Sequence, residues 1–235
     1  MNKEHIKHAD LRNICASSLI YGHTPKIWNP KMASYVLQEK NGQHIFNIIK
    51  TSKMMKLAGH VLRKRAEKNS TFLIVGTEKV SSLVINELKK GLNTYYINHR
   101  WLGGMLTNWP TVQQRVKRLT RLENLDKLEG MGSLSKKVSS SNKKEKEKLN
   151  AIFKGIKGMT TLPDIVIFAS QKRDSLAIQE CIKLGIVTVA IVDTNSNIGQ
   201  VSYPIPANDD SNSSINFILS FLLKEISEGS SNGVK

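Results

Sequence analysis

The chain has 235 residues, of which 40% are hydrophobic and 23% charged, and its formal net charge at pH 7 is +16. The apolar content excludes a wholly disordered chain, the two cysteines exclude a disulfide scaffold, and no apolar stretch is long enough to cross a membrane. Residues 1–70 carry a net charge of +9 and residues 107–160 a net charge of +8, whereas residues 161–235 carry −3. This asymmetry favours a polyanionic partner that contacts part of the surface over a generally basic protein without one.

The first fifty residues are predicted to be a basic N-terminal segment and a loop that leads into the sheet. We expect a short helix and an entry loop over residues 1–22. Gly22, Pro25 and Pro30 then lie close together, which disfavours regular structure in this region. From Thr51 onward, apolar side chains recur every three or four residues, and this spacing predicts a helix.

Apolar runs alternate with helical patterns through most of the remaining chain. The runs at residues 72–76, 94–97, 165–169 and 186–192 are typical of strands buried on both faces. Helices are predicted around residues 80–88, 174–184 (ended by Gly185) and 215–226. Strands that alternate with helices indicate an α/β fold, a doubly wound parallel sheet with helices on both faces.

Residues 107–160 interrupt this alternation. An apolar stripe from Val112 to Leu128 predicts one helix, which Gly130, Gly132 and the serines at 139–141 are expected to end. A Lys/Glu-rich helix follows from residue 142 to 156. The two arms predict a basic, coiled-coil-like helical hairpin inserted into an α/β domain. We prefer a hairpin that contacts RNA or an acidic protein to a hairpin that is only solvated.

The predicted organisation has four parts. Residues 1–50 form the N-terminal segment, residues 51–106 together with 161–228 form the α/β domain, residues 107–160 form the hairpin, and residues 229–235 form a flexible tail.

The predicted strand ends offer few groups for catalysis. Gly76 and Asp193 each follow a strand at the edge where α/β sheets bind ligands, but the chain has neither a dinucleotide-binding nor a P-loop glycine pattern. Asp193 could ligate Mg²⁺ or a ribose, although its polar neighbours favour a simple turn. Asp209 and Asp210 are interpreted as caps of the last helix. We therefore expect no enzyme, no cofactor and no metal site, and a nucleotide-dependent enzyme that uses Asp193 and Gly76 is the alternative.

Basic residues and tryptophans gather in two motifs, WNPKM at residues 28–32 and NHRWLGGMLTNW at residues 98–109. Guanidinium and amide groups beside glycines suit contacts to phosphates and bases. Trp101 and Trp109 could equally anchor the hairpin in the core. The predicted RNA-binding residues are Lys26, Trp28, Asn29, Lys31, Arg100, Trp101, Arg115, Lys117, Arg118 and Arg121.

Taken together, these motifs resemble the family of the second protein of the small ribosomal subunit, from about residue 11 to residue 230. The residues that carry the resemblance are Gly22-His23, 28–32, 44–47, 75–77, 98–109, 111–112, 155–157, Met159, 162–164, 184–186, 190–196 and 205–211. The resemblance implies a flavodoxin-like domain with a protruding hairpin. It also implies a structural role that binds small-subunit rRNA beside neighbouring ribosomal proteins and supports translation, with no catalysis, small-molecule substrate or membrane partner.

Residues 164–167, 205–211 and 228–230 look closest to the plastid branch of this family. Glu4 and Asp10 and the absence of an apolar run near the N-terminus disfavour a transit peptide or a secretory signal. The expected location is therefore the plastid (chloroplast) ribosome, with the bacterial cytoplasm or the mitochondrion as alternatives. Gly158 departs from the family pattern, which usually has an aspartate at this position.

Overall fold

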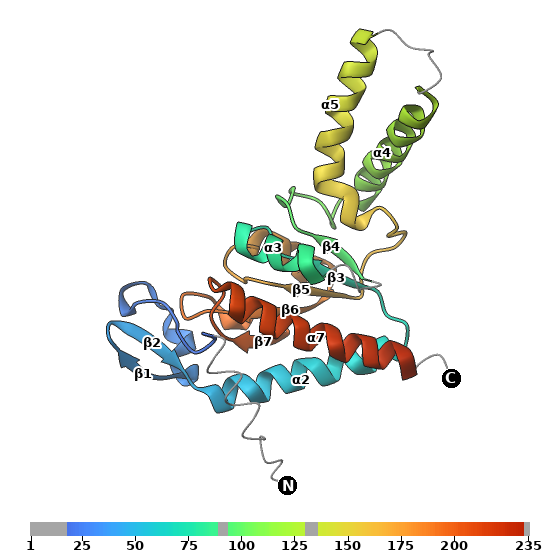
Figure 1. The fold of residues 1–235 in the computed structure, drawn as a ribbon. Coiled ribbons are helices and arrows are strands. Elements are labelled where there is room, and N and C mark those ends of the chain that lie inside the picture. Colours follow the sequence, from blue (N-terminus) through green and yellow to red (C-terminus); the bar gives the residue numbers. More distant parts are fainter. Residues whose placement is uncertain (1–17, 89–93, 130–135, 233–235) are drawn as a thin grey trace.

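The computed structural model describes residues 18–88, 94–129 and 136–232, so most of the expected N-terminal helix lies outside the described residues. At its centre is a parallel sheet of five strands in the order β4-β3-β5-β6-β7 (Figure 1). The strands are β3 (Phe72–Val75), β4 (Tyr95–Ile97), β5 (Ile165–Phe168), β6 (Val187–Val192) and β7 (Tyr203–Pro206). This arrangement confirms the predicted doubly wound, flavodoxin-like α/β fold. The sequence does not predict β7, whose two prolines disfavour a strand assignment.

Helices cover both faces of the sheet, and each face has its own hydrophobic core. Successive side chains of a strand point to opposite faces. Ile74 and Ile167 therefore enter a first core, and Val75 and Phe168 enter a second core. Helices α2 (Ile48–Ala66), α3 (Lys79–Leu88) and α7 (Asn212–Asn232) cover the first core, with α2 and α7 side by side in Figure 1. Helix α6 (Ser175–Leu184) covers the second core, and Gly185 ends it in the left-handed conformation, with φ 69°.

Helices α2 and α7 extend beyond the bounds that the sequence predicts. Helix α2 begins at Ile48 because the Asn47 side chain accepts hydrogen bonds from the backbone N–H groups of Ile49 and Lys50 (3.1 and 3.3 Å). Helix α7 continues to Asn232, so residues 229–232 of the expected flexible tail are helical. Gly229 lies against the backbone of Arg63 on α2, and this close packing extends the last helix.

The N-terminal segment contains more regular structure than expected. Strands β1 (Val36–Lys40) and β2 (Gln43–Phe46) form an antiparallel hairpin, preceded by the short 3₁₀ helices η1 (Pro25–Ile27) and η2 (Pro30–Tyr35). Asn41 and Gly42 turn the hairpin with φ angles of 53° and 75°. An Asn-Gly pair between two strands is a recognised signal for such a turn, and the sequence analysis did not use it.

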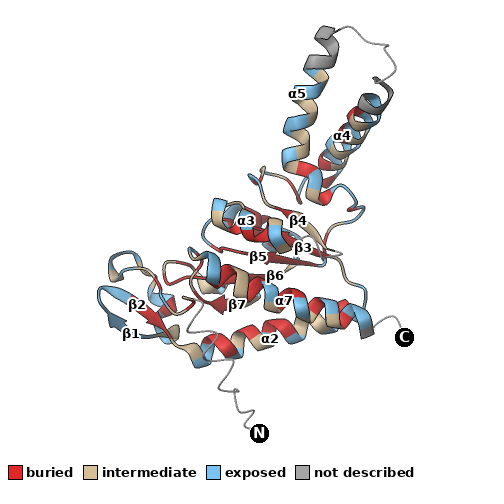
Figure 2. Cartoon of the chain, viewed as in Figure 1, coloured by how far each residue is buried: buried red, intermediate tan, exposed pale blue. Residues whose placement is uncertain are grey.

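The inserted hairpin consists of α4 (Trp109–Glu129) and α5 (Lys136–Phe153), followed by η4 (Lys154–Ile156). Helix α5 begins at Lys136 and so includes Ser139–Ser141, which were expected to lie in the break between the two arms. Relative to alanine, a serine lowers the stability of a helix interior by only about 0.5 kcal/mol. The hairpin projects away from the sheet (Figure 1), and, among its residues outside 126–140, the buried ones include several at its base (Figure 2). Val112, Leu119, Phe153 and Ile156 from this base belong to the second core.

None of the helices among residues 18–88, 94–129 and 136–232 is both long and apolar enough to cross a membrane.

Candidate nucleic-acid interface

The loop before β1 carries four of the predicted RNA-binding residues. Lys26 and Lys31 are exposed, whereas Trp28 and Asn29 are half-buried. The ring centroids of Trp28 and His44 are 5.2 Å apart, with an interplanar angle of 47°. Part of the Trp28 indole is therefore already in contact with the protein. The loop therefore presents its two ammonium groups and part of one indole ring.

Asn29 holds this loop in place. Its side-chain oxygen accepts a hydrogen bond from the backbone N–H of Lys31 (3.0 Å) and caps η2. Its backbone N–H donates to the carbonyl of Thr194 (2.7 Å), which follows β6. Asn29 therefore fixes the loop against the carboxyl end of the sheet, and its side-chain oxygen is already engaged within the protein.

The motif at residues 98–109 separates into an exposed and a buried part. Arg100 is exposed, and it makes no ion pair with any described residue. Trp101 is only 7% exposed, and its indole N–H donates to Glu180 (2.9 Å). Trp109 is 9% exposed and belongs to the second core. Both rings are therefore buried where the loop meets the sheet, and this favours the interpretation that they anchor the hairpin over the prediction that Trp101 contacts RNA.

The carboxylate of Glu180 organises this loop, and the sequence gives no sign of it. One oxygen accepts from the Trp101 indole and the Gly104 backbone N–H (2.9 and 2.8 Å). The other accepts from the backbone N–H groups of Leu106 and Thr107 (2.9 and 3.1 Å) and from the Thr107 hydroxyl (3.2 Å). Burial by itself raises the pKa of Glu180, but the hydrogen bonds together outweigh burial and hold that pKa below its ordinary value.

The hairpin arm α4 presents the remaining predicted residues. Arg115, Lys117, Arg118 and Arg121 are all exposed. Arg118 donates two hydrogen bonds to Glu145 on α5 (3.2 and 2.9 Å), and this contact lowers the pKa of Glu145. Arg118 therefore joins the two arms of the hairpin, while Arg115, Lys117 and Arg121 have no acidic partner among the described residues.

These residues do not form one compact site. The N-terminal loop lies against the end of β6, Arg100 follows β4, and the hairpin extends away from the sheet (Figure 1). Such a distribution suits an extended partner that contacts several parts of the surface, as folded RNA does.

The two residues of the alternative enzyme hypothesis have structural roles. A Cβ atom on Gly76 would lie 2.7 Å from the Ile85 side chain, so this glycine allows α3 to pack closely on β3. Asp193 accepts hydrogen bonds from the backbone N–H and hydroxyl of Thr194 (2.5 and 3.0 Å), as in the turn that its polar neighbours favour.

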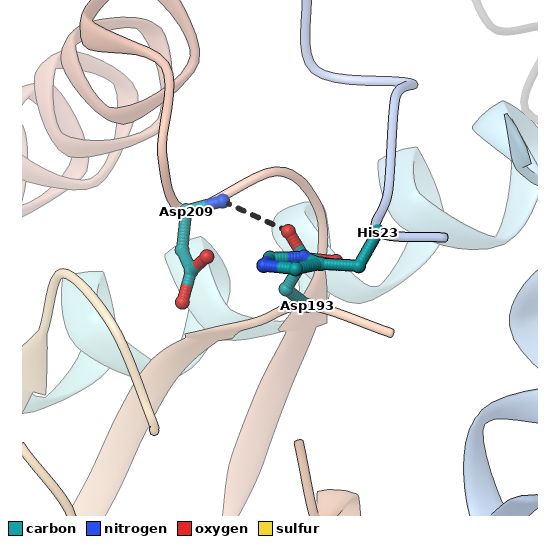
Figure 3. Close-up of side chains that lie close together, drawn as sticks. All are labelled: His23, Asp193 and Asp209. Atoms are coloured by element: carbon teal, nitrogen blue, oxygen red, sulfur yellow. Dashed lines mark hydrogen bonds and ion pairs between the residues drawn. The ribbon is translucent and has the colours of Figure 1, made fainter. Parts of the chain in front are cut away.

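Asp193 also belongs to a cluster that the sequence did not predict (Figure 3). Its carboxylate lies 3.1 Å from His23 Nδ1 and accepts from the backbone N–H of Asp209 (3.5 Å). His23, Asp193 and Asp209 each offer a ligand atom within 4.8 Å of the others. An imidazole and two carboxylates are suitable ligands for a divalent metal ion. Asp193 follows His23 by 170 residues and Asp209 follows it by 186 residues, so no local sequence motif indicates the cluster.

Burial shapes the protonation of this cluster. The pKa of His23 is raised chiefly because its ring donates a hydrogen bond to the Asp193 carboxylate. Burial, together with the charge of Asp193, raises the pKa of Asp209 to about 7, although Asp209 accepts a hydrogen bond from the Ser170 hydroxyl (2.5 Å). Asp209 was expected to cap α7, but its carboxylate accepts from Ser170 on the loop after β5. Asn208 accepts from the backbone N–H groups of Asp210 and Ser211, which lie just before the helix.

Comparison with known proteins agrees with the resemblance noted in the sequence. A family model described as "Ribosomal protein S2" matches residues 14–229. "Small ribosomal subunit protein uS2c" of Gracilaria tenuistipitata var. liui is 43% identical over 89% of this chain and 91% of its own length. The protein of the same name from Galdieria sulphuraria is 43% identical over 93% of both chains. "Small ribosomal subunit protein uS2" of Trichodesmium erythraeum is 42% identical over 93% of this chain and 80% of its own length.

The uS2c name, which marks the plastid-encoded form, recurs among the algal relatives, so the plastid ribosome is confirmed as the location of this protein. The family match covers nearly all the described residues and includes both the sheet and the hairpin. The chain therefore belongs to the ribosomal protein S2 family, a structural component of the small ribosomal subunit.

Proposed function

We propose that this protein binds small-subunit rRNA through the exposed basic residues of its hairpin and N-terminal loop, and so holds part of the subunit together without catalysing a reaction. The observation that carries the proposal is the outer surface of α4. Lys117 and Arg121 lie one helical turn apart, both exposed, on the side of the helix opposite its buried residues Val112 and Leu119.

Two acidic residues of the hairpin pair with other cations and not with Lys117 or Arg121. Glu123 pairs with Lys157, and Glu145 pairs with Arg118. Lys117 and Arg121 are left without an acidic partner among the described residues. Side chains of this kind bind RNA phosphates and release the counterions condensed on them, which makes the affinity depend on salt.

The test removes this charge without disturbing the fold. In the double variant Lys117→Ala, Arg121→Ala, alanine preserves the helix and the Arg118–Glu145 pair remains. Filter binding of the full chain to small-subunit rRNA, measured over a range of salt concentrations, should show weaker binding and a salt slope reduced by about two.

The control variant is Arg65→Ala, Lys183→Ala, which removes the same charge from exposed positions near the ends of α2 and α6. The proposal requires its salt slope to stay close to that of the wild type. Equal slopes for the hairpin variant and the control variant would show that α4 makes no specific phosphate contact.

A further inference from the structure

A cleft of about 600 Å³ lies at the carboxyl end of the sheet, and neither the sequence nor the family comparison assigns a function to it. We call it the switch-point cleft. Its walls come from three successive strand ends: Thr77 and Lys79 follow β3, residues 98–101 follow β4, and Arg173 and Asp174 follow β5.

The strand order explains why an opening forms here. Strand β3 has β4 on one side and β5 on the other. From β3 the chain crosses through α3 on the first face, and from β5 it crosses through α6 on the second face. The two connections therefore diverge and leave a crevice between the starts of α3 and α6. Open α/β sheets bind their ligands in this position.

The walls of the cleft favour an anion. Lys79 and Arg100 are both exposed and have no acidic partner among the described residues. Arg173 lies 3.1 Å from Glu78, so that pair is close to neutral. The first backbone N–H groups of α3 and α6 lie at the same opening, and a helix N-terminus adds positive potential. The cleft therefore offers two unpaired cations to a phosphate.

A second, independent feature requires a hydrogen-bond donor. Asp174 lines the cleft and is only 2% exposed. Its Oδ1 accepts from the Thr77 hydroxyl (2.6 Å), whereas its Oδ2 has no hydrogen-bond partner. Burial raises the pKa of Asp174 to about 6, so the carboxyl is mostly ionised at neutral pH. A buried carboxylate oxygen without a hydrogen-bond partner lowers the stability of the protein. A hydrogen bond donated by a hydroxyl group of a ligand would remove this penalty.

We propose that the switch-point cleft holds a single ribonucleotide of the small-subunit RNA, with its phosphate against Lys79 and Arg100 and its 2′-hydroxyl donating to Asp174. This inference rests on the proposed RNA-binding function and locates one contact that the hairpin cannot supply. His99 is exposed on the wall of the same cleft and offers a ring on which an unpaired base stacks. The 2′-hydroxyl contact makes this site selective for RNA over DNA.

The test uses the full chain bound to small-subunit rRNA and measures the acylation of every 2′-hydroxyl. The cleft variant is Lys79→Ala, Arg100→Ala, and the control is again Arg65→Ala, Lys183→Ala. We expect the wild type and the control to protect one short unpaired stretch that the cleft variant leaves reactive, while the protection caused by the hairpin persists. Loss of the two phosphate contacts should weaken overall binding about tenfold or more.

The role of Asp174 is tested from the RNA side, which avoids any loss of folding. A single 2′-deoxy substitution in the protected stretch should weaken binding to the wild type about tenfold. It should have little further effect on Asp174→Asn, which retains an acceptor for Thr77.

Three results would overturn the inference. The first is a cleft variant with the same protection pattern as the control. The second is a deoxy substitution without effect on the wild type. The third is saturable binding of free uridine 5′-monophosphate to the cleft without protection of rRNA, which would make a free nucleotide the ligand. If the hairpin variant alone loses rRNA affinity, the proposed function stands and only this inference fails; if the wild type does not bind rRNA, the proposed function itself fails.

Discussion

A single buried carboxylate, that of Glu180, determines the path of the loop between β4 and α4. Five donors from residues 101–107 converge on it, and three of them are backbone N–H groups. A loop of this length would otherwise leave these groups without partners inside the protein. Because the same loop ends at Trp109, the start of the hairpin depends on this one side chain.

Replacing the carboxylate with an amide should weaken the fold. In Glu180→Gln, an NH₂ group faces N–H donors, so we expect a loss of about 2–3 kcal/mol in the free energy of unfolding, measured with urea at pH 7. The matched control is Glu87→Gln on α3, an exposed position, with an expected change below about 0.5 kcal/mol. Equal changes in the two variants would show that the Glu180 contacts contribute nothing specific.

The same variant predicts a pH dependence. The pKa of Glu180 is lower in the folded protein than its ordinary value of 4.5, so the folded state binds the proton less readily than the unfolded state. Its contribution to stability is complete above pH 4.5 and is lost as the pH falls through the folded value. The difference in unfolding free energy between wild type and Glu180→Gln should therefore shrink as the pH falls below 4.5. A difference that stays constant down to pH 3 would contradict this assignment.

At the level of single residues, the sequence predicts which side chains are exposed better than it predicts which residues they contact. The exposure of Arg100, Lys117 and Arg121 follows from their positions between apolar residues. The burial of Trp101 was one of two open interpretations, because an indole ring suits both a core and a base. Neither Glu180 nor the cluster around His23 could be found, because their partners lie far away in the sequence and meet only through the folded sheet.

At the scale of elements, the hairpin packs closely on the sheet at their junction. Gly155 in η4 lies against β4, and a Cβ atom at this position would be 2.0 Å from the Tyr96 carbonyl oxygen. Three residues later, a Cβ atom on Gly158 would lie 3.5 Å from the Tyr95 ring, which is an ordinary contact. The glycine that departs from the family pattern is thus the one that tolerates a side chain.

These two glycines give a matched pair of variants. Gly155→Ala should lower the free energy of unfolding by about 2–3 kcal/mol, because the new methyl group meets backbone that cannot rotate away. Gly158→Ala should change it by less than about 0.5 kcal/mol. Urea denaturation of both variants checks the expectation, and a smaller effect for Gly155→Ala than for Gly158→Ala would refute it.

Elements with a strong local pattern were predicted well, and those with a weak pattern were not. The strands β3, β5 and β6 are continuous apolar runs that are too short for a typical buried helix, so they are assigned as strands. Strand β7 contains two prolines and is held in place by β6, so its pairing depends on the rest of the sheet. At the serines of α5 the sequence predicts a break, whereas the helix continues through them. An exposed helix tolerates residues of low helix propensity.

For the whole molecule, the sheet separates two cores that receive their helices from different parts of the chain. The first core combines α2, from the first third of the sequence, with α7 at its end. The second core combines α6 with the base of the hairpin. Loss of either set of helices exposes one whole face of the sheet.

Removal of α7 should therefore prevent folding. Six buried side chains of α7 belong to the first core, namely Ile215, Ile218, Leu219, Leu222, Leu223 and Ile226. Burial of each contributes about 1.5–3 kcal/mol, and the total stability of a domain is only about 5–15 kcal/mol. A chain that ends at Ala207 should lack cooperative thermal unfolding and a near-ultraviolet dichroism signal, whereas a chain that ends at Asn232 should retain both. A sharp transition in the shorter chain would disprove the dependence.

The pairing of α2 with α7 also means that the first core can be completed only late in the synthesis of the chain. Asn212 follows Ala66 by 146 residues, and a ribosome adds roughly 5–20 residues per second. The apolar side of α2 therefore stays without α7 for roughly 7–30 s, while the strands of the sheet are still being translated. During this interval the growing chain carries an unpaired amphipathic helix, which is the kind of surface that nascent-chain chaperones cover. A component of the translation apparatus thus depends, for its own maturation, on how fast its last helix leaves the exit tunnel.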